Sequence, residues 1–284
     1  MVVKKQHYYP RALLKHFAND DGKFYVYMRL ASGNKFQHMK YEKVCAARHT
    51  YEGTSENGEL EVDNKLEDKL SSLEEKLAPI VDKIIKTIKI TVCCRPTVDI
   101  NNEEIEFLYK YMVIQFLRTD SGRINFIRAA DINYRPRKYP IDLQEIKDSK
   151  NDILKFNNTF KKEGNLEVLL EILKKPKNMH FHIAKGNFIT SDNPVIGMNN
   201  WKQMHMPISQ DYCLGFQADG YSCSDNIIVN MSKEKNDYLN EAQIETANYF
   251  VISKGEFDSY TKFYIKNRFS DPNWEKKSRH FNFK

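Results

Sequence analysis

The sequence lacks the long apolar segments that would mark a membrane or exported protein. No uncharged apolar run approaches the ~20 residues that a membrane-spanning helix requires. The N-terminal stretch MVVKKQHYYPRALLKHF contains no apolar h-region of the kind found in secretory signals. We therefore expect a cytoplasmic protein that is neither exported by that route nor integral to a membrane.

The cysteines have no metal-binding or redox spacing. No CxxC pair occurs, so the sequence contains neither a zinc ribbon nor a thioredoxin-type motif. The five cysteines are Cys45, Cys93, Cys94, Cys213 and Cys223. Their number is odd, and the adjacent Cys93 and Cys94 are poorly placed for a mutual disulfide. Reduced, mostly buried thiols in a cytosol are the expected state.

Several common catalytic motifs are also missing. The chain has no P-loop, GxGxxG, GxSxG or HExxH motif, which disfavours the common NTPase, dinucleotide, hydrolase and zinc-protease classes. Cofactors and metal dependence stay open at this point, as do the oligomeric state and any partner protein.

The composition is that of a globular protein with a mildly basic charge. Of the 284 residues, 41% are hydrophobic and 12% aromatic, which argues against intrinsic disorder. The formal net charge is +6, and the lysines and arginines are spread over the whole length. Such a charge favours a polyanionic partner, nucleic acid or nucleotide, without establishing one.

Periodicity predicts a hairpin followed by a long helix. A strand at 24–28 and a return strand after residues 32–34 form the expected hairpin. From Leu66 to Ile88, apolar residues recur at steps of three and four, which defines one helical face. Pro79 should kink this helix or divide it into two.

The rest of the chain predicts more helices and then a strand-rich part. A helix is expected at 103–118 with Asn102 as its cap, and another at 153–173 with an interruption near Gly164. The remaining expected elements are strands at 179–190, 206–216, 227–229 and 249–253 and helices at 232–247 and through Tyr260 and Phe263.

We infer one α+β domain, helix-rich and with a mainly antiparallel sheet. Its expected parts are an N-terminal turn and hairpin (1–50), a helical middle (61–175) and a β-rich C-terminal part (179–284).

Four short segments, in order along nearly the whole chain, carry a family resemblance. They are Gln6-His7-Tyr8-Tyr9-Pro10-Arg11, Gln115-Phe116-Leu117-Arg118-Thr119, Ile189-Thr190-Ser191-Asp192-Asn193-Pro194 and Ala247-Asn248-Tyr249-Phe250-Val251. Together they resemble the bacterial domain of unknown function 4238 family. The resemblance implies one structural unit and a set of candidate residues, but no reaction.

The first segment offers a histidine beside an arginine. His7 and Arg11 on one turn suit phosphate binding, because arginine clamps oxygens bidentately while histidine moves a proton. Alternatively, the turn is structural and Arg11 pairs with a buried carboxylate. The Arg11-x4-His16 spacing also occurs in HEPN-type ribonucleases, although there it lies on a helix of a helical bundle.

The second segment places polar residues on an apolar helix. Tyr111, Gln115 and Arg118 share one helical face and need partners if buried. Those partners are either a ligand or the two glutamates Glu67 and Glu74, which would form a buried structural network with Arg118.

The strand-rich part supplies further candidates. Asp192 closes an apolar strand and could hold a metal, orient His7 or act as a base, or simply bond its own turn. His180 and His182 alternate on one strand, with His205 nearby, and could ligate a metal or merely face solvent.

We expect His7, Arg11, Gln115, Arg118 and Asp192 to converge on one polar pocket. The first hypothesis is an enzyme acting on phosphate-bearing substrates, a nuclease or nucleotide-processing effector of a bacterial immunity or toxin system. The alternative is a non-catalytic module that binds a nucleotide, nucleic acid or protein through the same pocket. A catalytic site needs a poised base in an open cleft, whereas a binding module needs aromatic and arginine side chains only.

Overall fold

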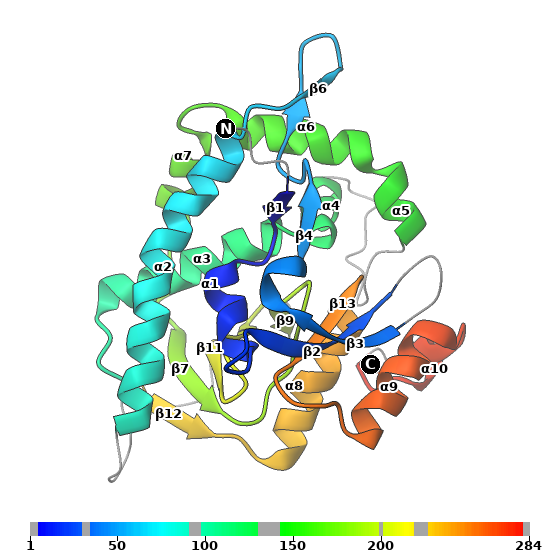
Figure 1. The fold of residues 1–284 in the computed structure, drawn as a ribbon. Helices are drawn as coiled ribbons and strands as arrows, with labels where there is room; N and C mark the ends of the chain where they lie inside the picture. The colour runs from blue at the N-terminus through cyan, green and yellow to red at the C-terminus, as the bar shows by residue number, and fades with distance from the viewer. Residues whose placement is uncertain are drawn as a thin grey trace.

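Two sheets occupy the lower half of the molecule, and most helices lie above and beside them (Figure 1). The computed structural model describes residues 5–29, 35–90, 98–129, 143–198, 201–218 and 227–280. Cys93, Cys94 and Cys223 lie outside these residues, while Cys45 and Cys213 are free and buried as expected.

The first sheet has the strand order β12-β7-β11-β10-β9. The strands are β7 (Met179–Lys185), β9 (Ile196–Met198), β10 (Gln203–Pro207), β11 (Tyr212–Ala218) and β12 (Ile227–Asn230). The strand expected at 206–216 is wrong, because β10 and β11 form a hairpin across that range. Its turn is fixed by the Ser209 hydroxyl, which accepts from the backbone N–H groups of Asp211 and Tyr212.

The second sheet has the strand order β3-β2-β13-β8. The strands are β2 (Lys23–Met28), β3 (Lys35–Lys40), β8 (Thr190–Ser191) and β13 (Phe250–Ser253). The β2–β3 hairpin is confirmed. The strand expected at 179–190 is instead two strands, β7 and β8, because the chain passes from the first sheet to the second between them.

Two short strand pairs near the N-terminus form separate two-stranded sheets. They are β1 (Lys5–His7) with β4 (Ala46–Arg48) and β5 (Gly53–Thr54) with β6 (Leu60–Glu61). Among the strands in the described part of the chain, every pairing except β7 with β12 is antiparallel. The fold is therefore α+β with mainly antiparallel pairing, as predicted.

The long helix α2 (Lys65–Ile90) confirms the predicted apolar stripe. Leu70 is 3% exposed and Leu77 is fully buried. The helix continues through Pro79, so it is not divided in two. Pro79 lies on the exposed side, and so does Glu75, whose carbonyl loses its helical donor and can be hydrated there.

Helix α3 (Asn102–Leu117) begins one residue earlier than predicted. Its cap is Asn101 rather than Asn102, because Asn101 accepts from the backbone of Glu104 while the Glu104 side chain accepts from the backbone of Asn101. The predicted break at Gly164 is confirmed. That glycine has φ +81°, which favours glycine, and it separates two helices.

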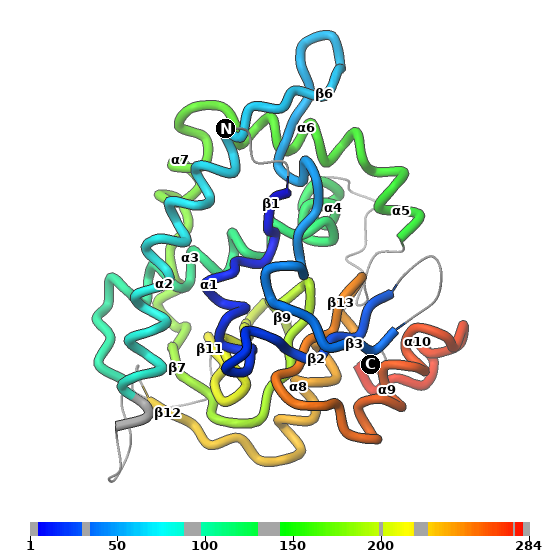
Figure 2. The backbone as a smooth tube through the Cα atoms, in the orientation of Figure 1, coloured from blue at the N-terminus to red at the C-terminus, as the bar shows by residue number. Residues whose placement is uncertain are grey.

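The remaining helices complete the layers around the sheets. They are α1 (Arg11–Leu14), α4 (Asp120–Arg128), α5 (Leu143–Asp148), α6 (Lys150–Lys161), α7 (Asn165–Ile172), α8 (Lys233–Thr246), α9 (Ser259–Ser270) and α10 (Trp274–Lys277), with the short 3₁₀ helices η1 (Lys15–Phe17) and η2 (Tyr41–Lys43). Figure 2 shows α2 and α3 beside the first sheet and α9 and α10 beside the second. In the part of the chain that the structure describes, no helix is long and apolar enough to span a membrane.

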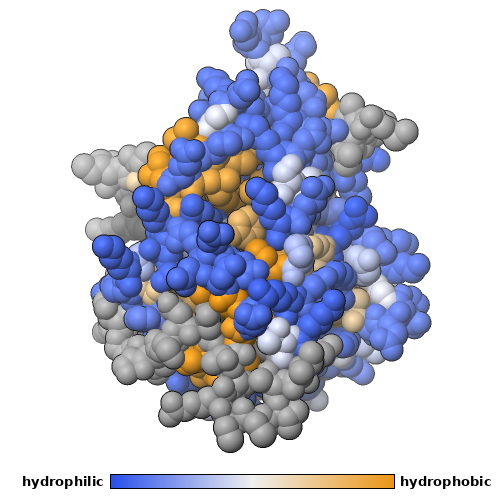
Figure 3. Space-filling model, turned by 90° about the vertical axis from the view of Figure 1, so that its left-hand side faces the viewer, coloured by the Kyte–Doolittle hydropathy of each residue, from blue (hydrophilic) through white to orange (hydrophobic). Residues whose placement is uncertain are grey.

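The surface on the side of α2 and α7 is largely polar, with apolar side chains visible between the polar ones (Figure 3). Two apolar residues of α7 contribute to the exposed surface of the protein, since Val168 is 51% exposed and Ile172 is 69% exposed. In Figure 3 apolar side chains of this side gather in the upper part of the view, with polar side chains around them.

Candidate functional site

The four family-like segments meet in one hydrogen-bonded assembly around the N-terminal segment. Gln115 Nε2 donates to the Tyr8 carbonyl at 2.8 Å, and Arg118 Nη2 donates to the His7 carbonyl at 2.8 Å. The Thr190 hydroxyl donates to the Tyr9 hydroxyl at 3.3 Å. The second and third segments thus both hold the backbone or side chains of the first.

The third and fourth segments join through Asp192. Its carboxylate accepts backbone N–H groups from Asn248, Tyr249 and Phe250 at 2.9–3.2 Å. Asp192 is 2% exposed, and burial raises its pKa to about 7, although the three backbone donors oppose that shift. The carboxylate therefore fixes the chain between α8 and β13, and its oxygens are already occupied.

Arg118 also lies among several buried or half-buried partners. It is 2% exposed, its Nη2 is 2.5 Å from Glu74 Oε1, and its Nε donates to the Tyr51 hydroxyl at 2.9 Å. Burial lowers the pKa of Arg118, but the charges of Tyr51 and Glu74 outweigh burial and hold that pKa above its usual value. The partner expected on the long helix, Glu74, is thus present, and Arg118 remains charged.

Gln6 extends this buried network. Its Nε2 donates to Glu52 Oε1 at 2.8 Å and to Asn64 Oδ1 at 3.3 Å, while its Oε1 accepts from the Tyr51 backbone. Gln6 and Glu52 are both fully buried. Glu52 and Tyr51 were not among the predicted residues, because both lie in an irregular stretch without periodicity.

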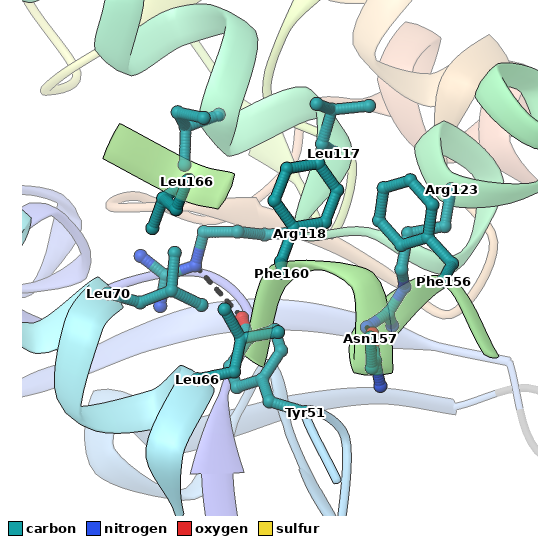
Figure 4. Close-up of a pocket in the computed structure, with 11 residues that line it drawn as sticks. Tyr51, Leu66, Leu70, Leu117, Arg118, Arg123, Phe156, Asn157, Phe160 and Leu166 are labelled. Carbon is teal, nitrogen blue, oxygen red and sulfur yellow. Dashed lines mark hydrogen bonds between the residues drawn. The ribbon is translucent and has the colours of Figure 1, made fainter. Parts of the chain in front are cut away.

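The pocket beside Arg118 is too narrow for a nucleotide. Its cavity volume is ≈ 30 Å³, which holds a water molecule or two. Figure 4 shows the Arg118 side chain bonded to Tyr51 among apolar side chains of α2, α6 and α7. His7, Arg11 and Asp192 do not line this pocket, so the five predicted residues do not share it.

One carboxylate beside Arg118 lacks a full set of partners. Glu67 Oε2 is buried and has no hydrogen-bond partner among the described residues. Burial raises the pKa of Glu67 to about 7; Arg118 opposes this shift and Glu74 adds to it.

Glu67 should make the free energy of unfolding depend on pH. Its ordinary pKa is 4.5, so between that pH and about 7 the folded protein keeps a proton that the unfolded chain releases. The contribution of protonated Glu67 to the free energy of unfolding is fully present below pH 4.5 and is lost as the pH rises through about 7. Glu67→Gln should therefore stabilise the protein above pH 7, by on the order of 1 kcal/mol once solvent screening is allowed for, and little at acid pH.

Urea titrations of wild type and variant at both ends of this pH range test the prediction. Glu75→Gln is the matched control, since Glu75 lies exposed on the same helix. An equal effect of the two substitutions at every pH would contradict the assignment.

His7 differs from these buried groups because it is only half-buried. Its Nε2 lies 3.1 Å from the Glu42 carbonyl. Burial lowers the pKa of His7 to about 4, and the charges of Arg11, Lys5 and Arg118 act in the same direction. The ring is therefore neutral near pH 7, with Nε2 carrying the hydrogen that the Glu42 carbonyl accepts and Nδ1 in its acceptor form.

Four exposed cations lie on β1, α1, η2 and β4, the segments next to His7, and we call them the N-terminal basic face. They are Lys5, Arg11, Lys43 and Arg48. Lys5 stands directly opposite Arg48 in the β1–β4 pair, and its Nζ reaches the Lys43 carbonyl at 3.4 Å. Within the described residues, none of the four forms an ion pair with a carboxylate. Like charges placed opposite each other are unfavourable, so this arrangement suits an external anion.

The other histidine candidates have different surroundings. His16 Nε2 contacts Asp82 at 3.0 Å, and it lies in η1 rather than in one helix with Arg11. His182 packs edge-on against His205 at 5.8 Å, and burial lowers their pKa values to about 4 and about 3. Among the residues that the structure describes, no three potential ligands gather into a metal site.

These features describe a helix-rich α+β protein in which four separated segments build one buried polar assembly beside a basic face. The chain belongs to the family described as protein of unknown function (DUF4238), whose model matches residues 5–256. No curated protein and no solved structure matches the chain.

Proposed function

We propose that this protein binds a phosphate-bearing partner, a nucleotide or a nucleic acid, through the N-terminal basic face. The observation that carries this proposal is the group of four exposed cations without a carboxylate partner in the described residues. Arginine and lysine at such positions bind phosphate oxygens, and Arg11 at the start of α1 is close enough to His7 at the end of β1 for its charge to lower the pKa of His7. The binding hypothesis is favoured over catalysis because Gln115, Arg118 and Asp192 are buried and already bond to other parts of the protein.

Direct binding measurements test this function. We expect Arg11→Ala with Arg48→Ala to weaken binding of a labelled single-stranded oligonucleotide about 10-fold at moderate salt, and to reduce the slope of log affinity against log salt by about two. Fluorescence anisotropy over a salt series gives both quantities.

The matched control removes two cations elsewhere. Lys147 and Lys150 are exposed on α5 and α6, so Lys147→Ala with Lys150→Ala changes the net charge equally. If both double variants lose the same affinity, binding reflects net charge and the basic face is not a site.

A second candidate function is hydrolysis of the bound partner by a nuclease or nucleotide-processing effector of a bacterial immunity or toxin system. One observation favours it. The His7 ring is neutral near pH 7 and lies in the electrostatic field of Lys5 and Arg11, so it can accept a proton there, as a weak base because of its lowered pKa. His7→Gln should then abolish cleavage of labelled DNA or RNA while leaving binding of the nucleic acid intact. If the wild-type protein binds these probes without cleaving them, it is a binding module and this second candidate is wrong.

A further inference from the structure

The β2–β3 hairpin carries aromatic and basic side chains and no acidic one. Its strands read KFYVYM and KFQHMK. Tyr25 and His38 face each other across the strands and stack, with ring centroids 4.7 Å apart and planes at 26°. The next pair on this face is Tyr27 and Phe36, at 5.2 Å. His38 is exposed and Phe36 is 36% exposed, so part of this aromatic row remains accessible.

A second pocket opens beside these rings. Its cavity volume is ≈ 190 Å³, and its walls include the rings of Tyr25, Phe36, His38 and Phe257 together with the charged pair Glu256 and Lys262. This volume is below the roughly 300–1,000 Å³ of sites for drug-sized ligands and suits one flat ring system. Lys262 is already paired, since its Nζ lies 2.5 Å from Glu256 Oε1. The pocket therefore offers ring surfaces more than charge.

Unpaired cations lie at the end of the same hairpin. Lys23 and Lys40 are direct cross-strand partners, two residues from the Tyr25–His38 pair on the same face. Neither forms an ion pair with a carboxylate in the described chain, and the exposed Asp20 and Asp21 of the preceding turn do not reach them. Opposed like charges destabilise a hairpin unless an anion lies between them.

The hairpin adjoins the N-terminal basic face. Lys40 is followed directly by η2, whose Lys43 carbonyl contacts Lys5 and whose Glu42 carbonyl contacts His7. In both Figure 1 and Figure 2 the β2–β3 hairpin lies just below the β1–β4 pair. Cations thus lead from the aromatic rings to the basic face.

We propose that the β2–β3 hairpin binds the bases of a single-stranded nucleic acid, whose phosphates follow Lys23 and Lys40 toward the N-terminal basic face. Proteins that bind single-stranded nucleic acid combine aromatic rings with cations. The bases stack on the rings, and the cations neutralise the negative charge of the phosphate backbone. An inorganic anion needs no ring, and a free nucleotide needs one ring and one phosphate site, whereas here the cations continue from the rings toward a separate basic face. This inference rests on the proposed function and narrows it to one partner class.

The test compares a probe with bases to a probe without them. Labelled oligothymidylate and oligouridylate supply bases and phosphates, and inorganic polyphosphate supplies phosphates only. In Tyr25→Leu and His38→Leu, affinity for the oligonucleotides should fall about 10-fold or more, while affinity for polyphosphate stays unchanged. Lys23→Ala with Lys40→Ala should weaken binding of both kinds of probe.

Phe126→Leu is the control for loss of an exposed ring, since Phe126 is 50% exposed on α4. Melting curves identify any variant that does not fold. Because Tyr25→Leu and His38→Leu are made separately, one of them can still be tested if the other does not fold. If the wild type binds no probe, the proposed function itself fails. If the wild type binds all of them and the ring variants bind oligonucleotides normally, or lose both kinds of probe equally, the hairpin is not a base-stacking site.

Discussion

Arg118→Ala should lower the free energy of unfolding by about 3–5 kcal/mol. Removing one partner of a buried pair leaves the other charge uncompensated, and that loss is typically of this size. Here the substitution would leave Glu74 without its cation and would also free the Tyr51 hydroxyl and the His7 carbonyl. Urea or thermal unfolding of the purified variant measures the change.

The control for this prediction conserves the charge. Arg118→Lys keeps a cation, but a lysine cannot bond to Glu74 and Tyr51 through two separate nitrogens as Arg118 does. We therefore expect a loss in the free energy of unfolding smaller than that of Arg118→Ala. If Arg118→Ala left stability unchanged while abolishing binding of a phosphate-bearing probe, Arg118 would serve a ligand, and its assignment to the scaffold would be wrong.

Leu77→Ala should cost about 2–5 kcal/mol, because Leu77 is fully buried in the stripe that α2 presents to the main core. Truncation removes apolar contacts and leaves a cavity that neighbouring side chains fill only partly. Leu60→Ala is the matched control, since Leu60 is 47% exposed on β6 and its truncation should stay within about 0.5 kcal/mol. Equal and small effects in both variants would mean that α2 does not pack as described.

Periodicity predicted the elements whose burial is regular. The α2 stripe is an example, since every third or fourth residue from Leu66 to Ile84 is apolar and packs into the core. The β10–β11 hairpin was missed because apolar residues lie on both sides of its turn, and only Ser209 and Asp211 marked the reversal. The short pairing of β1 with β4 could not be predicted, because three residues per strand carry no period.

The buried polar network was partly predictable. A polar side chain on an apolar helix must be satisfied, and this requirement alone makes Glu74 a candidate partner for Arg118. The other partners of Arg118 could not be predicted, because Tyr51 comes from an irregular segment and the His7 contact uses a backbone carbonyl. Every residue type has a backbone carbonyl, and all but proline have a backbone N–H, so the sequence does not indicate which of these groups a side chain will bond. Neither the Arg118 contact with the His7 carbonyl nor the backbone donors to Asp192 could therefore be inferred from sequence.

We propose that the N-terminal basic face binds phosphate while the buried assembly beside it supports the fold. The most direct measurement is the salt dependence of oligonucleotide affinity in a variant with Lys5, Arg11, Lys43 and Arg48 all replaced by alanine, together with its melting temperature. We predict a salt slope reduced by about four and a melting temperature close to that of the wild type. An unchanged slope and affinity in a folded variant would contradict the claim.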